Sequence, residues 1–73
     1  MKISQLQQKI GQRIRTLRES KGITQQDLAA ACNFEKTNMS RIEAGRTNPT
    51  ISTLYKISQA LEITISELVD VEV

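Results

Sequence analysis

Apolar residues recur three and four positions apart near the start of the chain, which is the spacing of one face of an α-helix. The stripe consists of Ile3, Leu6, Ile10, Ile14 and Leu17. Ser4 and Gln7 have the spacing of a capping box at the start of this helix, and Gly22 is well placed to end it. The pattern therefore predicts a first helix that ends just before Gly22.

Two short helices are predicted next, over residues 25–31 and about 36–44. Thr24 and Asp27 have the spacing of a capping box for the first of these two helices. Between them, Asn33 is the residue that best tolerates a left-handed backbone without being glycine. We therefore expect a turn of about three residues there.

The helix predicted over residues 36–44 has a weaker start signal. Its cap position holds Glu35, which caps a helix less well than Ser, Thr or Asp. Met39 and Ile42 supply its apolar face, and Gly45 is its stop signal.

Two more helices are predicted after the loop that ends at Thr50, which caps the fourth helix. The apolar stripe of that helix is Ile51, Leu54, Ile57 and Leu61. Thr64 and Glu67 form a capping box for a short fifth helix, and this box explains residues 63–66 better than a strand does. The sequence thus predicts one all-α domain with five helices over residues 1–73.

The second and third predicted helices have the arrangement of a helix-turn-helix over residues 25–44. This motif needs a small residue where the helices cross, which is Ala29, and a turn residue that accepts positive φ, which is Asn33. It also needs inward anchors on the second of its helices, which are Met39 and Ile42. DNA binding through the major groove is the function that this pattern predicts.

Composition excludes several other functions. The chain has one cysteine, Cys32, and no histidine, so we expect no disulfide, no metal site and no cofactor. Cys32 is expected in the core. The acids show no pairing that suggests general acid–base catalysis, no nucleophile stands beside a base, and there is no glycine-rich phosphate loop. The chain is therefore not expected to be an enzyme.

Hydropathy and charge indicate where the protein acts and what kind of partner it binds. No apolar run reaches the roughly 18–20 residues that cross a bilayer, and the N-terminus is too polar for a signal peptide, so we expect a cytoplasmic protein without a membrane partner. Residues 1–22 carry a formal charge of +5 and residues 51–73 carry −3. Such polarity suits a polyanion at the basic end, although a solvated helix face would have the same composition.

Three sequence runs are highly specific in combination. They are R-x-L-R at Arg15–Arg18, I-T-Q-Q-D-L-A at Ile23–Ala29 and R-I-E-x-G-R-x-N-P at Arg41–Pro49. Together they resemble the helix-turn-helix domain of the Cro and phage-repressor family, also called the XRE family, over about residues 10–69. Three positions depart from the usual residues: Asn33 for glycine, Glu35 for Ser or Thr, and Met39 for Ile or Val.

The resemblance implies a lambda-repressor-like fold and a set of DNA contacts. The residues expected to contact base edges are Lys36, Thr37, Asn38 and Arg41. The residues expected to contact phosphates are Gln25, Ser40, Arg46, Thr47 and Asn48. Asn48 is equally suited to be a turn residue that bonds its own backbone before Pro49. The same resemblance implies a structural ion pair between Arg18 and Glu43 inside the fold.

One recognition helix reads only a few base pairs, so we expect a homodimer on an inverted-repeat operator. The expected dimer contact is the C-terminal region, residues 62–73, as in related small regulators. Its apolar residues exceed the needs of the core: Leu68, Val69, Val71 and Val73. A regulator that activates transcription would also contact RNA polymerase.

Small stand-alone regulators such as restriction–modification controller proteins are the nearest functional match. One alternative is an antitoxin-type DNA-binding protein whose main task is to bind a protein partner. Another is the N-terminal domain of a longer repressor. Met1 and the acidic, apolar ending V-D-V-E-V favour a complete chain.

Overall fold

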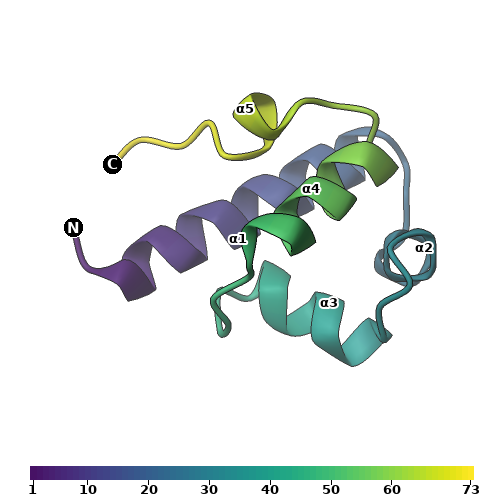
Figure 1. The fold of residues 1–73 in the computed structure, drawn as a ribbon, viewed down its shortest axis with the longest axis horizontal. Coiled ribbons are helices and arrows are strands. Elements are labelled where there is room, and N and C mark those ends of the chain that lie inside the picture. Colours follow the sequence, from purple (N-terminus) through teal and green to yellow (C-terminus); the bar gives the residue numbers. More distant parts are fainter.

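The computed structural model describes residues 1–73 and contains five α-helices and no strand, as the sequence pattern predicts (Figure 1). The helices are α1 (Ile3–Ser20), α2 (Gln25–Ala31), α3 (Lys36–Glu43), α4 (Ile51–Ala60) and α5 (Ile65–Leu68). α3 packs against α1 and α2, α5 packs against α1 and α4, and α2 also contacts α4. None of these helices is both long and apolar enough to cross a membrane.

The core draws on every helix. Its nine buried apolar residues are Ile14, Leu28, Ala29, Cys32, Met39, Ile42, Ile57, Leu61 and Leu68. Met39, Ile42 and Cys32 are therefore buried as predicted. Burial raises the pKa of the Cys32 thiol above its ordinary value, since the thiolate would lose its hydration there.

Two residues of the predicted apolar stripes are exposed, whereas the others are buried or half-buried. Ile3 is exposed, and Ile51 is 79% exposed. Each is the first residue of its helix. Ser58, two turns after Ile51 on the same side of α4, is buried. Tyr55, one turn after Ile51, is 50% exposed, so this side of α4 is covered only near Ser58.

Threonine side chains cap three of the helices. The hydroxyls of Thr24, Thr50 and Thr64 accept hydrogen bonds from the N–H groups three residues later, at 3.0, 3.1 and 3.1 Å. The Glu67 carboxylate accepts from the Thr64 N–H in return, and this hydrogen bond lowers the pKa of Glu67. These three threonine caps agree with the sequence, but Asp27 returns no hydrogen bond to Thr24, so the predicted capping box of α2 is incomplete.

The start of α1 differs from the prediction. The helix begins at Ile3, two residues before the position that a Ser4 cap requires, and Lys2 is its N-cap residue. The Gln5 side chain accepts the Lys2 N–H at 3.0 Å. Gln5 thus satisfies a backbone donor in the place of the Ser4–Gln7 box, whose predicted role is wrong.

Four helices end in a left-handed residue that reverses the chain. Gly22 and Gly45 take this conformation after α1 and α3, and Asn33 takes it after α2 with φ of 58°, as predicted. Glu62 does the same after α4, also with φ of 58°, although glutamate rarely adopts it. The Ile63 N–H bonds the Ser58 carbonyl at 3.0 Å, so the turn that leads into α5 holds Glu62 in place.

Gly11 allows α1 to lie directly on the end of α3. A Cβ atom at this position would be 2.5 Å from the Ile42 carbonyl oxygen and 2.6 Å from that of Glu43. The closest approach of the two helices is therefore backbone against backbone. A glycine inside a helix is otherwise unfavourable by about 1 kcal/mol relative to alanine.

Replacement of Gly11 by alanine should destabilise the fold in spite of that propensity. We expect the free energy of unfolding to fall by about 1–3 kcal/mol, because α1 and α3 have to separate. Urea denaturation followed by circular dichroism measures the change. Gln12→Ala, on the exposed side of the same helix, is the control and should be nearly neutral. A more stable Gly11→Ala protein would contradict the close contact.

Candidate nucleic-acid interface

α2 and α3 form a helix-turn-helix at the predicted place. The turn between them contains Asn33, and the Phe34 N–H closes it by bonding the Ala29 carbonyl at 2.8 Å. Ala29 is buried in the core, as the close packing of the two helices requires. Phe34 packs on the core, and the Lys56 ammonium lies 5.8 Å from the centre of its ring. α3 is thus anchored at both its start and its inner face.

α3 divides into a buried and an exposed face. Met39, Ile42 and Glu43 are turned inward. The exposed residues are Lys36, Thr37, Asn38, Ser40 and Arg41. None of these five side chains makes a hydrogen bond or an ion pair within the domain. Their donors and acceptors are free to bind an external partner.

Most of these side chains meet the following loop in a shallow hollow on the surface. It is lined by Lys36, Thr37, Ser40, Arg41 and Arg46, and by no apolar residue. The structure therefore brings together five of the predicted DNA-contact residues, three of them cationic. Asn38 is exposed but does not line this hollow. We call this set of residues the α3 hollow.

The loop after α3 supplies the remaining phosphate candidates. Arg46 and Asn48 are exposed, and Thr47 is half-buried. The Asn48 side chain makes no hydrogen bond to its own backbone, so that structural alternative is not what the fold shows. Asn48 instead lines, with Pro49, the rim of an apolar cleft against the first half of α1.

The Gln25 side chain has a different environment from the one predicted. Its Nε2 atom donates to Glu43 Oε1 at 3.0 Å, and the residue is half-buried. The amide is therefore partly occupied inside the domain, because the start of α2 lies beside the end of α3. A phosphate contact by Gln25 remains a prediction.

A buried ion pair joins α1 to the end of α3, between the predicted partners Arg18 and Glu43. Arg18 Nε and Nη2 donate to the two carboxylate oxygens at 2.7 and 3.0 Å, and Arg18 Nη1 donates to the Ile23 carbonyl at 2.8 Å. Arg18 is 8% exposed and Glu43 is 7% exposed. The hydrogen bond with Glu43 is the main reason that the pKa of Arg18 is raised. With Gln25 as a further donor, no buried side-chain polar atom is left without a partner.

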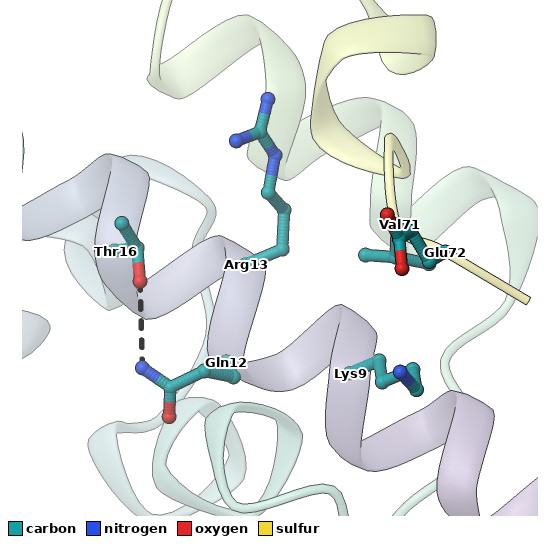
Figure 2. Close-up of a pocket in the computed structure, with 6 residues that line it drawn as sticks. All are labelled: Lys9, Gln12, Arg13, Thr16, Val71 and Glu72. Carbon is teal, nitrogen blue, oxygen red and sulfur yellow. Dashed lines mark hydrogen bonds between the residues drawn. The ribbon is translucent and has the colours of Figure 1, made fainter.

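The charged ends of the chain lie side by side, which corrects the predicted separation of charge. The chain returns over α1, so that Lys9, Gln12, Arg13 and Thr16 line a pocket with Val71 and Glu72 (Figure 2). Arg13 extends toward α5, where its Nε donates to the Glu67 carbonyl at 3.0 Å. The acidic C-terminal segment thus lies against the basic N-terminal one, although no ion pair joins them.

The middle of the chain carries a further cluster of positive charge. Residues 23–50 are neutral in sum, with three acids and three bases. One of the acids, Glu43, is buried against Arg18, so its charge does not reach the surface. A count by segment therefore misses the positive α3 hollow. No group of cysteine and carboxylate side chains is arranged to hold a metal ion.

The predicted dimer residues of the C-terminal region are not all available. Leu68 is fully buried in the core of the single chain, so its assignment to a dimer contact is wrong. A domain this small needs the side chain for its own core. Val69 packs on that core, Val71 is half-buried and Val73 is exposed.

Comparison with known proteins gives the family. Residues 14–68 match the helix-turn-helix family. A transcriptional regulator of this type from Sinorhizobium fredii, y4dJ, is 42% identical over 60 residues, which are 82% of this chain and 78% of that protein. The chain belongs to the XRE family of helix-turn-helix regulators. Proteins of this family bind DNA and regulate transcription, and this is the function of the domain.

Solved structures agree with this family. The restriction–modification controller protein C.AhdI from Aeromonas hydrophila superposes with a TM-score of 0.82 at 34% identity, covering 84% of this chain and 92% of that one. SinR, solved in complex with DNA, gives a TM-score of 0.76 at 39% identity, covering 84% and 98%. Several other XRE relatives are longer, and this chain spans 42–56% of their length.

Loss of the Glu43 charge should destabilise the fold strongly. In Glu43→Gln the Arg18 guanidinium stays buried without its counter-charge, so we expect the free energy of unfolding to fall by about 3–5 kcal/mol. Thermal and urea denaturation measure this loss.

The exposed pair Arg15–Glu19 is the matched control for that variant. Its side chains are about half exposed and 3.4 Å apart, so Glu19→Gln should change stability by less than about 1 kcal/mol. If the two substitutions lowered the free energy of unfolding equally, the burial of the Arg18–Glu43 pair would not be the reason for its effect on stability.

Proposed function

We propose that this chain is a sequence-specific regulator that binds an inverted-repeat operator as a homodimer, with α3 of each copy in the major groove. The α3 hollow carries this proposal, because its polar side chains are exposed, unpartnered and gathered on one face. The inner side of the same helix is fixed by Met39, Ile42 and the ion pair of Glu43. A rigid helix with a free polar face is what major-groove reading requires.

Each exposed residue of α3 has a base partner that suits its chemistry. Lys36 and Arg41 donate to the O6 and N7 acceptors of guanine. Asn38 pairs with the N7 and N6 atoms of adenine, and the Thr37 methyl group contacts the thymine methyl. These four residues are the proposed source of sequence specificity.

Phosphate contacts position the helix on the duplex. Arg46 supplies a cation at the edge of the α3 hollow, and Ser40 lies beside it as a hydroxyl donor. Thr47 and Asn48 continue this edge along the loop. Gln25 contributes at the start of α2 through whatever donor its bond to Glu43 leaves free. Such contacts hold the register and carry no sequence information.

Dimerisation requires an apolar surface that the single chain leaves open. Ile51 and Tyr55 are large, exposed and one turn apart on α4. Val73 is exposed at the C-terminus, and Val71, two residues earlier, is half-buried. We place the main contact on α4, since its two large side chains belong to a rigid helix. Half-sites about 34–36 Å apart would then receive the two copies of α3.

Selection of bound duplexes from a random DNA library at near-physiological salt tests whether the protein binds DNA sequence-specifically. We expect an enriched inverted repeat for the wild type and its loss for Arg41→Ala, because Arg41 is exposed in the α3 hollow. Lys9→Ala removes the same charge from a residue that lines a different pocket, outside the α3 hollow, and should leave the repeat unchanged.

An absence of enrichment beyond salt-sensitive background would contradict the proposal. Weak binding of all sequences would reflect charge alone. It would favour the partner-binding function of an antitoxin-type protein, for which DNA reading is secondary.

A charge at Ile51 should break the dimer without unfolding the chain. Because Ile51 is 79% exposed, we expect Ile51→Asp to keep its melting temperature but to sediment as a monomer where the wild type is a dimer. Val73→Asp is the matched control at the C-terminus. If Val73→Asp alone gave monomers, the contact would lie in the C-terminal segment and not on α4.

A further inference from the structure

Glu35 occupies a capping position that it does not use. Thr24, Thr50 and Thr64 each bond the third N–H of their helix, whereas the Glu35 side chain makes no cap hydrogen bond to α3. Its backbone is extended, with φ of −73° and ψ of 147°, as at the other caps. The side chain is exposed and forms no ion pair, even though Lys36 is adjacent. Its carboxylate is therefore free for an external donor.

Glu35 precedes the first residue of α3, so its carboxylate lies at the end of the helix that, under the proposed function, contacts the bases. Residues 32–44 contain two acids, and the other one, Glu43, is buried. Glu35 is thus the one exposed negative charge of the turn and recognition helix. In a surface that approaches a polyanion, such a charge is unfavourable unless a donor on the DNA compensates for it.

We propose that Glu35 is a specificity-determining residue that accepts a hydrogen bond from the N4 amino group of a cytosine; this inference rests on the proposed function. In the major groove, guanine offers acceptors at O6 and N7, and thymine offers an acceptor at O4. A carboxylate is repelled by all three. The adenine amino group lies next to the N7 acceptor, so the cytosine amino group is the most favourable partner.

Glu35→Gln tests this role, because it keeps the size of the side chain and removes the charge that rejects acceptors. Wild type and variant are each selected against the same random duplex library at the same salt. We expect the wild type to prefer cytosine at one position in each half-site by about fivefold or more. The variant should lose that preference and keep the rest of the motif.

Asp27→Asn is the matched control, since it removes one exposed negative charge from the neighbouring helix α2. It should leave every position of the motif unchanged. Two results would overturn the role of Glu35: identical motifs for wild type and Glu35→Gln, or a uniform gain in affinity for all sequences in that variant. If the wild type itself enriched no motif, the proposed function would fail instead, so the two failures are distinguishable.

Discussion

The ion pair between Arg18 and Glu43 is the interaction on which the rest of the structure depends. It joins the longest helix to the last residue of α3, and its further hydrogen bonds reach Ile23 and Gln25 at the start of the helix-turn-helix. Gly11 brings the backbones of the same two helices together beside it. A buried charge pair tolerates little displacement, because each partner loses its compensation when the other moves. The end of α3 is thereby fixed in position and in rotation.

This fixed end explains why so short a helix has a free face. α3 has eight residues, and three of them hold it to the domain. Glu43 is one of the three, so its negative charge is neutralised inside the fold and does not offset Lys36 and Arg41 outside. The positive surface therefore arises from where charges are buried, not from their number. The net charge of the segment gives no sign of it.

Local signals made much of the fold predictable, and tertiary contacts account for the rest. The threonine caps and the left-handed Asn33 depend on residues within one turn, which the sequence displays directly. Exposure of Ile51 and burial of Leu68 depend on which elements cover them, and periodicity does not specify that. A glycine inside a helical pattern, such as Gly11, indicates close contact with another helix. The spacing of the apolar residues does not show this contact. For the site, family-specific motifs indicated the residues of α3, but not the bond between Gln25 and Glu43.

The small size of the domain links its core to its assembly. Leu68 is drawn into the core because a chain of 73 residues has few large apolar side chains to bury. The C-terminal segment is then held along α1, with Arg13 bonded to the Glu67 carbonyl, and Val73 is its one exposed large apolar side chain. Ile51 is under no such demand, since it stays 79% exposed in the folded chain. An apolar side chain that is not buried in the core of the single chain is available to contact a second copy. Which residues the core buries therefore determines which surface of the domain can form a dimer.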